Sequence, residues 1–127
     1  MKAIRILLME DDPLIGPLVA ELLENAGYEV CAIAPTEADA IASAHEHRPD
    51  LIIADARLGT GSGIAAVEEI LHSRFVPHLF ITGDVSRVKA RKPDALVLEK
   101  PFREADLMRA IQQVLDIAPA SSLPERT

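Results

Sequence analysis

Three consecutive carboxylates follow an apolar run near the start of the chain, in the stretch LLMEDDP. Asp12 before Pro13 is typical of a helix start, because Asp accepts backbone N–H bonds as an N-cap and proline is favoured at the first helical position. Glu10 and Asp11 have no such structural role. Adjacent carboxylates repel each other unless a positive charge lies between them. The pair therefore indicates a cation site.

The elements that would position these acids are visible as short apolar runs. Four runs are nearly continuous in apolar character, as expected for strands buried on both faces of a parallel sheet. A fifth alternates more, and we expect it at an edge of the sheet. In chain order the runs are 4–9, 29–33 (the alternating one), 51–55, 78–82 and 95–99.

Helical periodicity fills the segments between the runs. We expect a first helix between Asp12 and Gly27, a second opening at Thr36, a third over 64–74 and a last over 103–118. The segment 83–94 is close to the minimum of about a dozen residues for a parallel crossover, so a shortened or irregular fourth helix is predicted there. The predicted inward stripes are Leu14, Ile15, Leu18, Val19, Leu22 and Leu23 in the first helix, and Ala38, Ile41, Ala42 and His45 in the second.

Strands that alternate with helices indicate an α/β fold with a doubly wound, five-stranded parallel sheet. In such sheets ligands bind beyond the carboxyl ends of the strands, where the winding direction switches. If the first and third strands are neighbours, as in the order 2-1-3-4-5, Glu10 and Asp11 converge there with Asp55. Thr82 ends the fourth strand and Lys100 follows the fifth. The predicted site thus combines three acids, a hydroxyl and an ammonium group.

These residues resemble the receiver domain of two-component response regulators, a flavodoxin-like fold, over about 4–118. The motifs that carry the resemblance are LLMEDDPLIG, DLIIADARLGTGSG, LFITGD and LEKPF. The resemblance implies that Asp55 is a phosphoacceptor, a carboxylate nucleophile that takes a phosphoryl group from a phosphohistidine. It also implies a Mg²⁺ ion held by Glu10, Asp11, Asp55 and the backbone carbonyl of Arg57, since Mg²⁺ prefers oxygen ligands.

Further roles follow from the same resemblance. Thr82 and Lys100 would each contact a phosphoryl oxygen. Pro101 is a candidate for a cis peptide bond after Lys100. Arg57 and Asp84 would flank the phosphoryl group and tune the rate of dephosphorylation.

The chain also departs from the family pattern. Val97 occupies the position of the usual switch aromatic, so the rotation of a Tyr or Phe is not expected here. Gly59 stands where a proline is common, which predicts a looser loop. The stretch FITGD is similar to the Phe-Ala-Thr-Gly motif of a subfamily of stand-alone receivers, with Ile81 in place of the alanine.

Composition limits the remaining possibilities. A chain of 127 residues suits one domain, which we place at 1–118 with a flexible tail at 119–127. The formal net charge of −7 argues against nucleic acid as a partner. The single Cys31, the absence of a signal-peptide pattern and the absence of a long apolar run predict a cytoplasmic protein without a membrane segment.

We therefore expect a single-domain, non-enzymatic response regulator whose partners are a histidine kinase or phosphotransfer protein and a downstream protein target. It would signal by protein contact or act as a phosphate sink, as a monomer or weak phosphorylation-dependent dimer. Two alternatives stay open. A Mg²⁺-dependent phosphatase or Toprim-like enzyme would need a second acid where Arg57 stands, and a degenerate receiver would only bind a partner.

Overall fold

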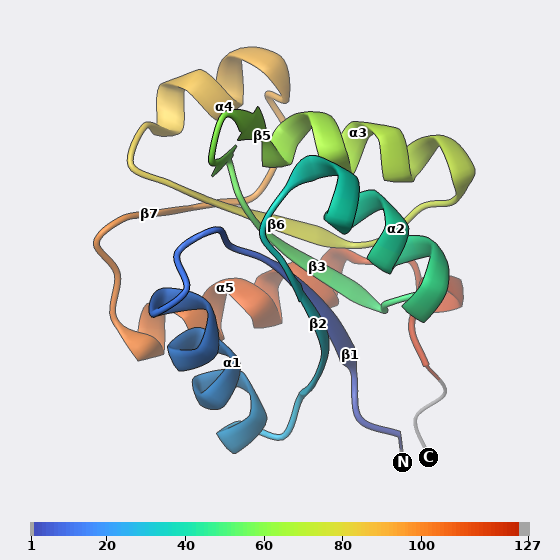
Figure 1. The fold of residues 1–127 in the computed structure, drawn as a ribbon. Coiled ribbons are helices and arrows are strands. Elements are labelled where there is room, and N and C mark those ends of the chain that lie inside the picture. Colours follow the sequence, from blue (N-terminus) through green and yellow to red (C-terminus); the bar gives the residue numbers. More distant parts are fainter. Residues whose placement is uncertain (1, 125–127) are drawn as a thin grey trace.

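The five apolar runs form a parallel sheet in the order β2-β1-β3-β6-β7, which confirms the predicted topology (Figure 1). The alternating run forms an edge strand, as predicted. The computed structural model describes residues 2–124. Its sheet consists of β1 (Arg5–Met9), β2 (Glu29–Ala34), β3 (Leu51–Asp55), β6 (His78–Thr82) and β7 (Val97–Glu99).

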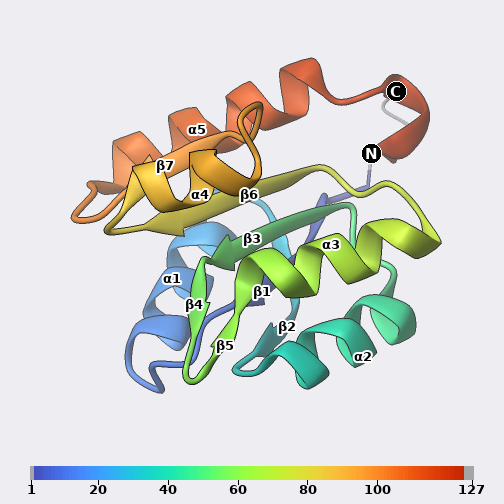
Figure 2. The same cartoon turned by 90° about the horizontal axis from the view of Figure 1, so that it is seen from above.

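Helices cover both faces of this sheet, with α1 and α5 on one face and α2, α3 and α4 on the other (Figures 1 and 2). Their bounds are α1 Ile15–Asn25, α2 Glu37–His47, α3 Gly63–Ser73, α4 Val85–Arg91 and α5 Glu104–Ile117. The 7 residues of α4 confirm the predicted short fourth helix. None of the helices in the described part of the chain is long and apolar enough to cross a membrane.

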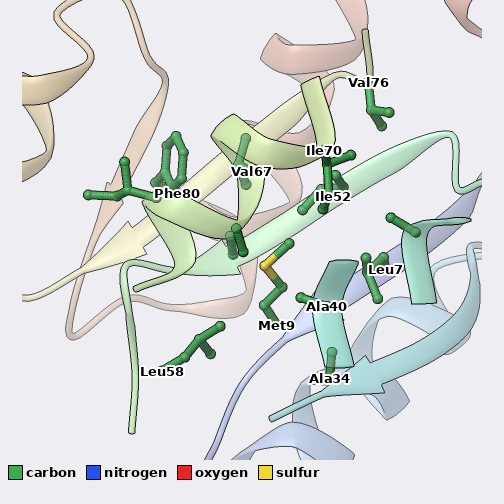
Figure 3. Close-up of a cluster of buried hydrophobic side chains, with 14 of the residues drawn as sticks. Leu7, Met9, Ala34, Ala40, Ile52, Leu58, Val67, Ile70, Val76 and Phe80 are labelled. Atoms are coloured by element: carbon green, nitrogen blue, oxygen red, sulfur yellow. The ribbon is translucent and has the colours of Figure 1, made fainter. Parts of the chain in front are cut away.

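The core consists of two apolar layers, because successive side chains of a strand point to opposite faces. Figure 3 shows the layer beneath α2 and α3, where Leu7, Met9 and Phe80 lie fully buried. The other layer contacts α1 and α5 through the alternate strand residues. Its members include Ile6, Leu8, Leu51, Ile53, Leu79, Ile81, Leu107 and Ile111.

The first helix turns a different face to the sheet than its periodicity predicts. Leu14, Ile15 and Leu18 are 75%, 42% and 58% exposed, so their prediction as inward residues was wrong. The reason lies at Gly16, where a side-chain carbon would approach Ile33 Cγ2 to 3.1 Å. The small residue lets α1 lie close to β2. The helix has apolar residues on several sides, and this close approach determines which side faces the sheet. The residues that α1 buries are Gly16, Val19, Ala20 and Leu23.

The second helix shows a similar shift of phase. It buries Ala40 and Ala44, whereas the predicted inward residues Ala38, Ala42 and His45 are exposed. Alanines at alternate positions give a helix no single apolar stripe, so the pattern did not decide which face turns inward. The predicted start is confirmed, since Thr36 Oγ1 accepts a 3.1 Å hydrogen bond from Asp39 N.

Two further elements were not predicted. After β3 the chain forms a short antiparallel hairpin, β4 (Arg57–Leu58) and β5 (Gly61–Ser62), where a looser loop was expected. Beyond α5, a turn of 3₁₀ helix spans Ala120–Ser122, and Leu123 packs against the layer beneath α5. Residues 125–127 of the predicted tail lie outside the described residues.

Candidate functional site

Three acidic side chains meet at the carboxyl ends of β1 and β3. Asp55 is the last residue of β3 and only 8% exposed. Glu10 continues β1, with its N–H 3.1 Å from Ala34 O, and Asp11 follows it. One carboxylate oxygen from each of Glu10, Asp11 and Asp55 lies within 4.8 Å of the others. The sheet order therefore brings together the acids that the sequence places at two separate strand ends.

Lys100 supplies the positive charge of the site. Its Nζ lies 2.6 Å from Asp55 Oδ2, and its backbone N–H donates to Thr82 O at 2.8 Å, which continues the pairing of β6 and β7. The Lys100–Pro101 peptide bond is cis. Burial alone would lower the pKa of Lys100, but the hydrogen bond and the charge of Asp55 outweigh it, and the pKa is raised. The lysine is held in its charged form against the acids.

Glu10 is the acid whose charged form is disfavoured by its surroundings in the cluster. Burial raises the pKa of Glu10, and the charges of Asp55 and Asp11 raise it further. A 3.1 Å hydrogen bond from Asp12 N to Glu10 Oε2 and the charge of Lys100 act in the opposite direction. A cation among the three carboxylates would relieve this repulsion, and an all-oxygen donor set suits Mg²⁺.

Asp12 bonds the turn before α1, whereas the N-cap residue is Leu14 and not Asp12 as the sequence predicts. Its Oδ1 accepts hydrogen bonds from Leu14 N at 2.8 Å and Ile15 N at 3.2 Å. The helix itself begins at Ile15, two residues later than the predicted start at Pro13. The Asp12 side chain therefore caps the turn that leads into α1, and the acidic cluster is formed by Glu10, Asp11 and Asp55 without it.

The β4–β5 hairpin contacts two of the three acids through backbone N–H groups. Arg57 N donates to Asp55 Oδ1 and Gly59 N donates to Asp11 Oδ2, both at 3.1 Å. Gly59 has a φ of +57°, which favours glycine and is closed to proline. At the far end of the hairpin Ser62 N donates to Glu37 Oε1 at 2.5 Å. The contacts of Gly59 with Asp11 and of Ser62 with Glu37 join residues distant in sequence, so no local pattern predicts them.

Thr82 and Asp84 are bonded to each other rather than to the acids. The buried Thr82 Oγ1 accepts a hydrogen bond from Asp84 N at 3.0 Å and lies 3.3 Å from Asp84 O. The Asp84 carboxylate caps α4 through Arg87 N at 3.2 Å, and its hydrogen bond from Ser86 is the largest of the contacts that lower its pKa. Val97 lies in β7 opposite Phe80 and packs against the core.

Comparison with known proteins decides the family. The family model for the response regulator receiver domain matches residues 6–112. The chain belongs to this family. The resemblance found in the sequence motifs is thereby confirmed, whereas the roles of individual residues stay predictions.

The relatives of this receiver include regulators that are longer than this chain. The phyllosphere-induced regulator PhyR of Methylorubrum extorquens is 38% identical over 89% of this chain and 44% of its own length. The transcriptional regulatory protein PdtaR of Mycobacterium tuberculosis is 37% identical over 85% of this chain and 55% of its own. The chain spans about half the length of these two relatives.

A solved structure covers nearly the same extent as this receiver. The PhyR receiver domain of Erythrobacter litoralis has a TM-score of 0.87 and 31% identity, covering 100% of this chain and 98% of that one. The similarity in fold therefore extends across the whole described chain.

Proposed function

We propose that this receiver accepts a phosphoryl group on Asp55 from a histidine kinase or a histidine phosphotransfer protein. The observation that carries the proposal is the position of Asp55. It lies nearly buried at the end of β3, with Lys100 Nζ at 2.6 Å and two further carboxylates within 4.8 Å. A buried acid with a charged lysine on one side and an all-oxygen cluster on the other suits phosphoryl transfer, which depends on positioning and charge neutralisation.

In the proposed step an Asp55 carboxylate oxygen attacks the phosphorus of a phosphohistidine. The new P–O bond forms as the P–N bond breaks, and the donor imidazole leaves with the bonding electron pair and takes up a proton. Lys100 exchanges its contact with the carboxylate for one with a phosphoryl oxygen. Asp55 thereby becomes an aspartyl phosphate, and no other covalent bond of the chain changes.

Mg²⁺ would be held by Glu10, Asp11, Asp55 and the carbonyl of Arg57. When bound, it would neutralise charge on the transferring phosphoryl oxygens. The three carboxylates fit this ion, because one oxygen of each lies within 4.8 Å of the others and the raised pKa of Glu10 is one that a cation would lower. Arg57 and Asp84 are proposed to tune the later hydrolysis. The Asp84 side chain would do so from its position as the cap of α4.

Phosphorylation would change the conformation through Thr82. Its hydroxyl would leave Asp84 and bond a phosphoryl oxygen, which shifts an existing equilibrium between two arrangements of α4. Val97 is too small to act as a rotating aromatic switch, so α4 itself is proposed to carry the change. The output would be a protein contact or the removal of phosphate from a partner. One solved relative, PhyR of Bartonella quintana, is named as an anti-anti-sigma factor, which is an example of such a contact.

The phosphatase or Toprim-like alternative is not favoured. It requires a second acid two residues after Asp55, and Arg57 occupies that position. PhyR and PdtaR, the two relatives described above, are named as regulators rather than phosphatases.

The test is the intact mass of the protein after incubation with acetyl phosphate, with and without Mg²⁺. We expect the wild type to gain one phosphoryl group only with the metal, and Asp55→Asn to gain none. Asp12→Asn is the matched control, because asparagine also caps a helix and this acid lies outside the cluster. Equal phosphorylation of Asp55→Asn would refute the assignment. So would a wild type that neither gains mass nor binds beryllofluoride.

A further inference from the structure

Glu37 connects the start of α2 to the acidic site through the β4–β5 hairpin. Its Oε1 accepts the backbone N–H of Ser62 at 2.5 Å, although the two residues lie on different elements. Gly61 allows this approach, since a side-chain carbon there would lie 2.8 Å from Glu37 Oε1 and 3.0 Å from its Cγ. The carboxylate of Glu37 therefore fits closely against the second strand of the hairpin.

The hairpin backbone donates to the acids from β4 and from the turn that follows it. Gly59 N donates to Asp11 Oδ2 and Arg57 N donates to Asp55 Oδ1, each at 3.1 Å. Arg57 pairs with Ser62 across the hairpin, so the residue that Glu37 binds is opposite the one that binds Asp55. A displacement of Ser62 would be transmitted to both N–H donors.

The hairpin is also anchored by a buried side chain, that of Leu58. Leu58 is 2% exposed and belongs to the core layer beneath α2 and α3. An open depression of about 520 Å³ lies between the turn of the hairpin and the start of α2. Burial of Leu58 thus anchors β4, and the Glu37 hydrogen bond holds the N–H of Ser62 in β5.

We infer that Glu37 is a positioning residue for the cation site, holding the hairpin so that Gly59 N–H orients the Asp11 carboxylate. With one Asp11 oxygen engaged by Gly59, the other is left for the ion. The role of Asp11 as a metal ligand rests on the proposed function. The orientation of Asp11 by the hairpin is independent of it.

The experiment compares amide hydrogen exchange in the metal-free protein and Mg²⁺ affinity for four variants. Glu37→Ala removes the acceptor, and Gly61→Ala displaces the Glu37 side chain without removing it. Glu37→Gln keeps an acceptor oxygen without the charge. Asp39→Ala removes another acid from the first turn of α2 and leaves the hairpin untouched.

We expect Gly59 and Ser62 amides to exchange faster in Glu37→Ala and Gly61→Ala, while amides of β1 and β3 keep their wild-type rates. The Mg²⁺ dissociation constant should rise about tenfold in both, the usual effect of removing a group that orients a metal ligand. Glu37→Gln and Asp39→Ala should remain close to wild type in both measurements. Because the exchange is measured without metal, it does not depend on phosphorylation.

Unchanged exchange of the Gly59 amide in Glu37→Ala would overturn the inference. So would an equal loss of Mg²⁺ affinity in Glu37→Gln, which would show that the charge of Glu37 acts rather than its hydrogen bond. A wild type that binds no Mg²⁺ would instead refute the proposed function. Faster exchange of Gly59 in that case would still support the positioning of Asp11.

Discussion

Gly63 is the residue whose replacement should most damage the site without removing any of its polar groups. It begins α3, and its N–H donates to Ala56 O at 3.0 Å. In Gly63→Ala the new methyl carbon would lie 3.0 Å from the Asp55 carbonyl carbon and closer still to its oxygen. Carbon atoms pack best at about 3.5–4.0 Å. Because the obstacle is backbone, no side-chain rotation relieves it, and the end of β3 or the start of α3 must move.

The magnitude follows from these contacts. Overpacking of this kind costs about 1–3 kcal/mol, and the N–H that loses Ala56 O adds about 1–3 kcal/mol. Alanine restricts the unfolded chain, which offsets about 0.4–1 kcal/mol. We expect a net loss of about 3 kcal/mol in the free energy of unfolding. That is a large part of the stability of a domain this size, which is about 5–15 kcal/mol.

The assay is urea unfolding followed by far-UV circular dichroism, since the chain has no Trp and a single Tyr. Gly83→Ala is the matched control, because nothing lies within 4 Å of the added carbon there. Without a clash, restriction of the unfolded chain should raise its free energy of unfolding by about 0.4–1 kcal/mol. Equal stability of the two variants would refute the steric argument. Gly63→Ala should also accept phosphate more slowly, since its strain acts directly on Asp55.

Two further predictions concern stability alone. Burial lowers the pKa of His78, against a 2.8 Å hydrogen bond to Val76 O that raises it. The unfolded chain then binds a proton more tightly than the folded one, so the free energy of unfolding should fall as the pH decreases below about 6.5. His78→Gln should flatten this part of the pH profile in chemical denaturation, and an unchanged slope would contradict the assignment. Thr36→Ala removes the cap of α2 and should destabilise the protein by about 1 kcal/mol, measured against the exposed Thr60→Ala as control.

The sheet and the proximity of the three acids could be predicted because both depend on the order of the strands. The apolar runs in the sequence indicate the strands and so limit the possible orders. Continuous apolar strands with helices between them leave few topologies, and any order that pairs the first and third strands brings Glu10 and Asp11 to Asp55. The short α4 was predicted from the length of the segment 83–94 alone, because it is close to the minimum for a parallel crossover. These features depend on the type of residue at each position and need no knowledge of side-chain contacts.

Other features could not be read from local patterns. The first helix has apolar residues on more than one side, and only the close approach at Gly16 selects the side that faces the sheet. The hairpin after Asp55 joins strands of 2 residues each, too short for any periodicity. Glu37 follows the helix cap Thr36, in the first turn of α2, where the helix dipole favours an acid. An acid at this position is therefore expected without any tertiary contact, and its contact with Ser62 could not be predicted from the sequence.

The most direct test of the account is to locate the phosphoryl group. Protein phosphorylated in the presence of Mg²⁺ would be reduced with borohydride, which converts an aspartyl phosphate to homoserine, and its peptides analysed by mass spectrometry. We expect homoserine at position 55 and at no other acid. Homoserine at position 11 or 12, or phosphate on a histidine or hydroxyl side chain, would contradict it.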